Sequence, residues 1–210
     1  MKRKLICLSV VALMSITAMA QLEKGSFYYI PRIGLSLSNL THQEIYAGFN
    51  ESSNKSEGKW KAGVAAGIDL EYMVANPVGI SVGVFYQMQG CRHSAIDDMP
   101  KWNTTLGYLN LPIMAHLYVG NGFSFNAGIQ PGLLLNQDDK VYESGYKKMD
   151  FAIPVGVGYE FSNGWSIDAR YNWGLNQISK AVDKMGKVAD NMDVHNRTIS
   201  VTVGYRIPLR

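Results

Sequence analysis

The sequence predicts an all-β protein, an eight-stranded antiparallel up-and-down transmembrane β-barrel with four longer external loops. Three observations predict this fold. Apolar and more polar residues alternate with a period of two along most of the chain. The connections between the alternating stretches are in turn long and short. Beyond the N-terminal segment, no apolar run is long enough for a membrane-spanning helix.

The stretch 105–135 shows this design as a single β-hairpin. In both arms the odd-numbered positions are mostly aliphatic or aromatic, whereas the even-numbered positions are richer in Asn, His, Ser, Gly and Gln. The pair Asn121-Gly122 between the arms is a tight-turn signal, because both residues tolerate a positive φ. Each arm has about a dozen residues, which is the length of a tilted strand that crosses a bilayer.

Six further stretches repeat the alternation. The eight predicted strands span residues 25–38, 60–73, 79–90, 105–119, 123–135, 149–161, 165–175 and 196–209. Short turns are predicted at Asn76-Pro77, Asn121-Gly122 and Asn163-Gly164, and long connections at 39–59, 91–104, 136–148 and 176–195. This order is typical of outer-membrane barrels, which have short turns on one side and long loops on the other.

The alternation alone does not tell which face points inward, since a soluble lipocalin-like barrel also alternates. Three features favour an apolar outer wall that faces lipid. The more polar face is crowded with Gly, Ala and Ser, which suit a narrow lumen. Its few charges have both signs, so they can pair inside the barrel. Aromatic residues gather near the short turns and, more weakly, near the long connections, as in the girdles at membrane interfaces. The stronger group comprises Phe27, Tyr29, Tyr72, Phe123, Phe125, Phe161, Trp165 and Tyr205, and the weaker one Trp60, Tyr86, Phe151 and Trp173.

Four prolines fall within the predicted strands, at Pro31, Pro112, Pro131 and Pro154. Each removes a hydrogen-bond donor from the ladder, and a closed barrel has no free edge to accommodate the loss. We therefore expect bulges or distorted pairing at these positions, with a break in one of the strands as an alternative.

The N-terminus has the pattern of a secretory signal peptide. Three basic residues precede an apolar stretch, and Ala18-Met19-Ala20 is a small-x-small cleavage site. We expect residues 1–20 to be the signal peptide and 21–210 to form one barrel domain. The three basic residues account for the formal charge of +3, so the mature chain is near neutral and has no basic patch for nucleic acid. Cys91 is expected to be an incidental loop thiol, with an intermolecular disulfide as the alternative.

The candidate site is a network of charges on the inward face of the strands. It comprises Arg32, Asp69, Glu71, Glu160, Asp168, Arg170 and Arg206. We interpret it as structural, because an eight-stranded barrel is normally filled by its own side chains. A narrow solute path through the same residues is the alternative. The external segments 51–61 and 180–193 are polar and charged, so they could bind a partner in the cell envelope.

The sequence does not predict catalysis, a cofactor or a metal site. His116 faces inward, but no local motif places a serine and a carboxylate beside it, so we expect it to form hydrogen bonds in the lumen. The other histidines are scattered among the predicted loops, and the chain lacks closely spaced Cys and His ligands.

Three stretches resemble the Bacteroidota outer-membrane β-barrel domain family that includes PorT-like proteins. They are Tyr-Leu-Asn-Leu-Pro at 108–112, Gly-Val-Gly-Tyr-Glu-Phe at 156–161 and Val-Gly-Tyr-Arg at 203–206. The architecture is also similar to that of the OmpA and OmpX barrels. The resemblance implies an outer-membrane location without one particular activity. The chain departs from such barrels at its end, where Ile-Pro-Leu-Arg at 207–210 replaces the usual terminal aromatic residue.

These observations predict an integral outer-membrane barrel of a Gram-negative, Bacteroidota-like bacterium. We expect a non-enzymatic monomer, surrounded by outer-membrane lipid, that stabilises the envelope or presents its loops to an envelope protein. The alternatives are a soluble periplasmic lipocalin-like barrel that carries an apolar ligand, and a PorT-like accessory protein of a secretion system.

Overall fold

The computed structural model describes residues 24–41, 45–46, 55–56, 58–93, 101–120, 122–138, 146–178 and 194–209. The predicted signal peptide and most residues of the long connections, including 51–54, 57 and 180–193, lie outside the described residues. The described residues contain no helix long and apolar enough to cross a membrane.

The chain forms an antiparallel barrel of eight strands, which confirms the predicted fold. The strands are β1 (Phe27–Thr41), β4 (Lys61–Ala75), β5 (Val78–His93), β6 (Trp102–Asn110), β7 (Ile113–Val119), β8 (Phe123–Asp138), β9 (Met149–Glu160), β10 (Trp165–Gly174), β11 (His195–Tyr205) and β12 (Ile207–Leu209). The segments β6 and β7 together make one wall strand, as do β11 and β12. Two short pieces, β2 (Ile45–Tyr46) and β3 (Lys55–Ser56), pair outside the barrel.

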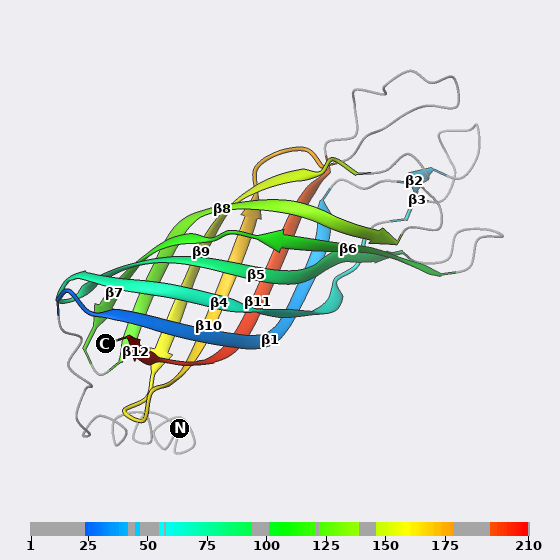
Figure 1. Ribbon diagram of the computed structural model, residues 1–210. Helices are drawn as coiled ribbons and strands as arrows, with labels where there is room; N and C mark the ends of the chain where they lie inside the picture. The colour runs from blue at the N-terminus through cyan, green and yellow to red at the C-terminus, as the bar shows by residue number, and fades with distance from the viewer. Residues whose placement is uncertain are drawn as a thin grey trace, which may run out of the picture.

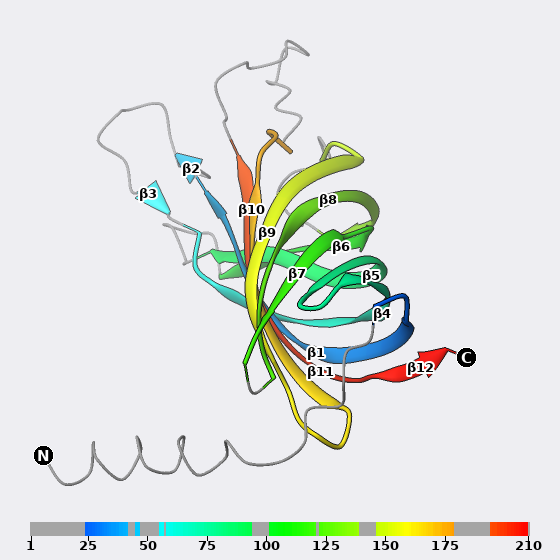
Figure 2. The same cartoon turned by 90° about the vertical axis from the view of Figure 1, so that its left-hand side faces the viewer.

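Consecutive strands pair around the ring, and β1 closes it by pairing with β11 and β12. Figure 1 shows the tilted strands, with the short turns at one end and, at the other end, the strand ends that lead into the long connections. We call these the turn end and the loop end. Figure 2 shows β1 and β11 lying side by side where the ring closes. The last strand finishes at the turn end, where Leu209 pairs with Phe27.

Apolar side chains cover the outer wall, as predicted. Ile33 is 69 % exposed and Phe125 is 57 % exposed, whereas Asp69 on the inner face is 1 % exposed. Exposed outward side chains and buried inward side chains alternate in this way around the whole ring, because successive side chains of a strand point to its two opposite faces. A lipocalin-like barrel would place the apolar face around a ligand, so the structure does not support that alternative.

The aromatic residues near the short turns form pairs on the outer wall. The rings of Phe27 and Tyr72 lie 4.6 Å apart, and those of Trp165 and Tyr205 lie 5.3 Å apart. At the loop end, Trp60 and Trp173 are also exposed. The apolar wall is therefore bordered by aromatic residues at both ends, as expected for a barrel in a bilayer.

Each proline distorts the ladder locally, and one wall strand is broken. The break separates β6 from β7 at Pro112, where the Pro112 carbonyl still accepts from Gly83 N–H at 2.8 Å. Pro131 lies beside this break, and its carbonyl accepts from Leu111 N–H at 2.8 Å. Pro31 lies where β11 ends and β12 begins on the neighbouring strand. Pro154 lies in a gap of the β8–β9 pairing. The ring still closes because neighbouring carbonyls keep their partners.

The prediction that Cys91 is a loop thiol is wrong. Strand β5 continues to His93 and β6 begins at Trp102, so the predicted loop 91–104 is largely strand. Cys91 is buried in the lumen, with Sγ 3.1 Å from His93 Nε2. The statement that the chain lacks closely spaced Cys and His residues is therefore wrong for this one pair, although the described residues contain no metal-binding group of three. The apolar alternation stops near residue 90 because the outward positions become polar, as at Arg92 and Asn103, while the inward positions stay buried. The strands thus extend beyond the apolar belt at the loop end.

Candidate functional site

The lumen of the barrel gathers the predicted site residues, because their strands place them all on the inward face. Two ion-pair groups lie toward the turn end and the middle, and an apolar cluster fills the loop end. A small cavity, lined mainly by polar residues together with Ala65 and Phe85, lies between these layers.

The first group is centred on Arg206, which lies in the short interruption between β11 and β12. Its Nε is 2.8 Å from Glu160 Oε2, and its Nη2 is 3.1 Å from Glu71 Oε2. The same guanidinium lies over the ring of Tyr28 at 4.5 Å and donates to the hydroxyl of Tyr118. Tyr118 in turn donates to Glu71 Oε1 at 2.6 Å. One cation therefore ties together side chains from five wall strands.

The second group lies one layer deeper and joins two arginines to two aspartates. Asp69 Oδ2 is 2.9 Å from Arg32 Nε and 3.1 Å from Arg170 Nη2. Arg170 Nε is 2.5 Å from Asp168 Oδ1. Arg32 also donates to Ser166 at 3.2 Å. This chain of charges runs along the inner wall from β4 and β1 to β10 and spans the intervening strand β11.

The structure thus brings all seven predicted residues into two ion-pair groups, which we call the charge network. Three guanidinium groups face four carboxylates, and all seven side chains are largely removed from solvent. Desolvation of such charges is costly, so each needs its partner in place.

Two glycines on β5 leave space for two of the network carboxylates. A Cβ at Gly83 would lie 2.3 Å from Asp69 Oδ1, and one at Gly79 would lie 2.4 Å from Glu71 Oε1. The small residues of the inward face therefore set where the larger charged side chains can lie in this narrow lumen.

His116 has partners that the sequence analysis did not find. Its Nε2 is 2.8 Å from Ser81 Oγ, and its Nδ1 is 2.9 Å from Asn126 Oδ1. Asn126 donates to Asp168 at 2.7 Å, so His116 is linked to the charge network. His116 therefore forms hydrogen bonds in the lumen, as expected, and its serine partner comes from another strand, so no local motif marks it.

This arrangement resembles a nucleophile, a base and an orienting amide, but it lacks room for a substrate. Ser81 is 1 % exposed, and the cavity of about 10 Å³ beside His116 does not include Ser81 in its lining. Neither this cavity nor the larger one of about 20 Å³ is lined by Ser81, so neither brings a substrate carbonyl to its hydroxyl. The three residues therefore act as a hydrogen-bonded part of the lumen filling.

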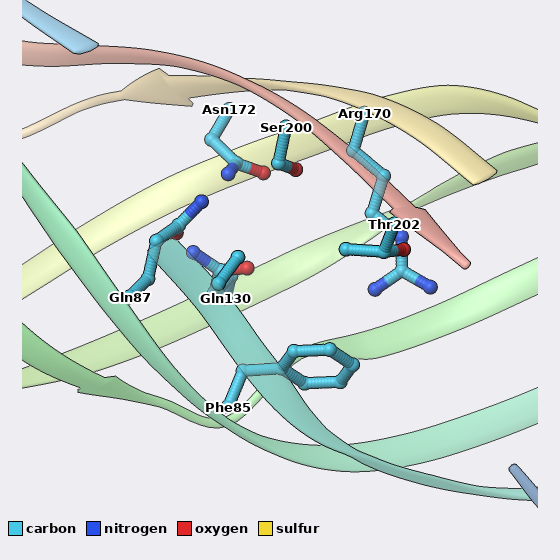
Figure 3. Close-up of a pocket in the computed structure, with 8 residues that line it drawn as sticks. Phe85, Gln87, Gln130, Arg170, Asn172, Ser200 and Thr202 are labelled. Atoms are coloured by element: carbon cyan, nitrogen blue, oxygen red, sulfur yellow. The ribbon is translucent and has the colours of Figure 1, made fainter. Parts of the chain in front are cut away.

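A cavity of about 20 Å³ lies above the second ion-pair group (Figure 3). Figure 3 shows amide, hydroxyl and guanidinium groups turned toward this space, with Phe85 on one side. Its lining is Ala65, Phe85, Gln87, Gln130, Arg170, Asn172, Ser200 and Thr202. A space of this size holds about one or two water molecules.

Apolar side chains close the loop end of the lumen. The apolar cluster comprises Leu40, Cys91, Leu106, Tyr108, Tyr146, Ile178 and Val194. Tyr146, Ile178 and Val194 come from the described ends of the long connections, which are fixed by backbone hydrogen bonds. Ile178 N–H donates to Val194 O at 2.9 Å, and Lys147 N–H donates to Ile178 O at 2.7 Å. The sequence analysis missed this cluster, because isolated apolar residues in irregular segments carry no periodic signal.

The comparisons with known proteins agree with this geometry. Residues 19–180 match the family model described as the outer membrane protein beta-barrel domain. The chain belongs to this family. Its members lie in the outer membrane of Gram-negative bacteria, so lipid surrounds the apolar wall and the short turns face the periplasm. A comparison with curated proteins gives no match.

Solved structures of outer-membrane proteins share the fold. Neisserial surface protein A is 13 % identical, with a TM-score of 0.52 over 86 % of this chain and 97 % of that one. OprG from Pseudomonas aeruginosa is 10 % identical, with a TM-score of 0.52 over 88 % of this chain and 97 % of that one. At these identities the likeness concerns the fold of the family member and not its activity.

Proposed function

We propose that this protein is a closed, non-conducting and non-enzymatic outer-membrane barrel that presents its external loops to another component of the cell envelope. The observation that carries the proposal is the filling of the lumen by two different layers. The charge network crosses it toward the turn end, and the apolar cluster crosses it at the loop end. An ion would have to pass both layers in sequence.

The ion pairs of the charge network oppose the conduction of ions through the lumen. A conducting lumen needs charged groups that water can reach and that an ion can exchange with. Here Arg170 is held by both Asp69 and Asp168, and Arg206 by both Glu71 and Glu160. Opening a path would separate buried ion pairs, and breaking such pairs is strongly unfavourable.

The apolar cluster supports the second part of the proposal, the presentation of loops. It fixes the bases of the connections that follow β8 and β10, since Tyr146 and Ile178 are buried in it. Tyr146 N–H also donates to the side chain of Gln137 at the end of β8, at 3.1 Å. Anchored bases limit the space that long polar loops explore, which lowers the entropic cost of binding a partner.

Three finer assignments belong to the same proposal. Residues 1–20 would be removed as a signal peptide, and 21–210 would remain as the mature monomeric barrel. The motifs at 108–112, 156–161 and 203–206 favour a PorT-like member from Bacteroidota. A role beside a secretion system is then one form that the loop-mediated interaction could take.

Single-channel recording tests the closed lumen. Purified protein is reconstituted in planar bilayers, and its insertion is checked by the shift of the band on boiling in SDS. We expect no steady conductance steps from inserted, heat-modifiable protein. Steps that change in size with Arg170→Gln would overturn the proposal, because the ions would then pass the charge network.

Photo-crosslinking in whole cells tests the loops. A photoreactive residue is placed at Glu51 in an external segment or, as a matched control, at Asn163 in a short turn. We expect a discrete adduct from position 51 that is absent from position 163. No adduct from position 51, or the same adduct from both positions, would contradict loop-mediated binding.

A further inference from the structure

One part of the lumen wall carries polar groups that the charge network does not use. Asp150 on β9, Asn172 on β10, and Asn196 and Thr198 on β11 line the wall between the network and the apolar cluster. Asn172 and Thr198 are direct cross-strand partners. These four residues form what we call the oxygen wall.

Gly174 explains how this wall is assembled. A Cβ at Gly174 would lie 3.3 Å from Asn196 Cβ, so a larger side chain there would crowd Asn196. With glycine between them, Asn196 reaches across β10 and its Nδ2 donates to Asp150 Oδ2 at 2.6 Å. The contact fixes the carboxylate of Asp150 against the lumen wall.

Each residue of the oxygen wall keeps one oxygen without a hydrogen-bond partner. The four atoms are Asp150 Oδ1, Asn172 Oδ1, Asn196 Oδ1 and Thr198 Oγ1. All four residues are at least 95 % buried. Buried polar atoms are normally paired, and four unpaired oxygens on three adjacent strands are costly unless something binds them. The two amide oxygens and an ionised Asp150 carboxylate can only accept, so their ligand must be a donor or a cation. The buried Tyr108 hydroxyl beside Asn196 supplies at most one of these donors.

The charge of Asp150 favours a cation. The other inward aspartates, Asp69 and Asp168, each have an arginine within 3.1 Å. The cationic groups of the described residues whose charge acts on Asp150 are His195 and Arg197. Arg197 is turned away, because its guanidinium lies over Trp173 at 5.3 Å and donates to the carbonyls of Gly174 and Asn196. His195 also lies at an outward-facing position of β11.

We propose that the oxygen wall is a binding site for a hard cation. The carboxylate of Asp150 supplies the charge, and the amide and hydroxyl oxygens of Asn172, Asn196 and Thr198 supply neutral ligands. Oxygen ligands of this kind are those that hard cations prefer. A single carboxylate balances one positive charge, so the site suits a monovalent ion such as Na⁺ better than a divalent one.

The site differs in kind from the His and Cys sites that the sequence analysis considered. The described residues hold no group of three His, Cys, Asp or Glu side chains that could bind a metal. The oxygen wall instead uses one acid with three neutral oxygens. Asn172 also lines the cavity of about 20 Å³, which provides room for water that completes the coordination of the ion. A bound ion would join β9, β10 and β11 just below the bases of the external loops.

Thermal unfolding in different chloride salts tests this site. The full mature protein is refolded in detergent micelles, and its melting temperature is measured in NaCl, KCl, CaCl₂ and choline chloride at equal ionic strength. A site filled at about 100 times its Kd should raise the melting temperature by on the order of 5–10 °C relative to choline, because the ion binds only the folded barrel. Asp150→Asn keeps the shape of the side chain and should abolish this difference.

Two further variants keep the test decisive. Asp138→Asn removes an exposed acid at the end of β8 and should retain the full cation effect. Thr198→Val keeps the shape but removes one oxygen, so it should reduce the effect while the barrel stays heat-modifiable. Equal melting temperatures of the wild type in all salts would overturn the proposal, since water alone would then satisfy the wall. A cation effect that persists in Asp150→Asn would overturn it as well.

Discussion

The two ends of the lumen are filled by side chains of different chemistry. Toward the turn end, three arginines and four carboxylates form ion pairs across the barrel, beside a small apolar cluster of Tyr28, Ile30, Met73 and Tyr118. At the loop end the larger apolar cluster fills the barrel without a comparable set of ion pairs among the described residues. Six of the seven charged residues of the ionic layer lie on strands and Arg206 lies in the short interruption between β11 and β12, so each is fixed by its position in the wall. The apolar layer recruits the bases of the loops, so it couples the barrel to the surface that a partner meets. The difference indicates that the ionic layer holds the barrel together and the apolar layer positions the loops.

The largest effect is expected from breaking the ionic layer at its centre. Arg170→Met leaves Asp69 and Asp168 buried with one partner fewer, and should cost about 3–5 kcal/mol of unfolding free energy. Urea unfolding of protein refolded in lipid vesicles, followed by tryptophan fluorescence, measures this loss. The double variant that adds Asp168→Asn should recover much of it, because Asp69 keeps Arg32 as its partner and no unpaired charge remains. A single variant as stable as the wild type would show that the pairs do not hold the barrel.

A cavity in the apolar layer should have the next largest effect. Leu106 is fully buried, so Leu106→Ala should cost about 3 kcal/mol through lost contacts and the space left behind. The same unfolding experiment measures it. The change should also loosen the loop bases, which limited proteolysis of intact cells would detect as faster cleavage in the external loops. Unchanged cleavage would show that the apolar cluster does not position the external loops.

The His116 contacts should have a smaller, structural effect. His116→Ala leaves Ser81 and Asn126 without a shared partner and should cost about 1–3 kcal/mol. A fluorophosphonate probe should not label the wild-type protein, because the Ser81 hydroxyl is closed off. Labelling that disappears in Ser81→Ala would contradict the structural interpretation and indicate a hydrolase.

The smallest effect is expected outside the lumen. Arg92 is exposed on the outer face at the loop end, and the ion pairs described above do not include it. Arg92→Gln should change the unfolding free energy by less than about 0.5 kcal/mol. It therefore serves as the matched control for Arg170→Met in the same urea titration. A loss as large as that of Arg170→Met would mean that charge anywhere on the barrel matters, and not pairing in the lumen.

The sequence located the strands and the charged residues of the lumen because both follow from a period of two. Once the apolar face of a strand was assigned to the outside, the inward position of Asp69 or Arg170 followed directly. Their partners did not follow, because these depend on the stagger between strands and on contacts across the lumen. Asp69 meets Arg170 more than a hundred positions away in the chain, as Ser81 meets His116 across another strand pair.

The loop end was harder to predict for a different reason. Strands β5 and β6 continue past the lipid, where outward residues such as Arg92 become polar and the apolar alternation disappears. Cys91 was therefore assigned to a loop. Tyr146, Ile178 and Val194 were missed because each is a single apolar residue in an irregular segment, and their burial depends on where the connection folds back. The oxygen wall needed the positions of individual atoms, which no sequence pattern supplies.

The closed loop end can be tested on a residue that the chain already contains. Cys91 lies in the apolar cluster with no exposed surface. Intact outer membranes are treated with a membrane-impermeant maleimide, and modification of Cys91 is located by peptide mass spectrometry, with protein unfolded by boiling in SDS as the reference. If both layers fill the lumen as described, Cys91 should stay unmodified in the folded barrel and react fully after unfolding. Rapid modification of Cys91 in folded, heat-modifiable barrels would contradict a closed lumen.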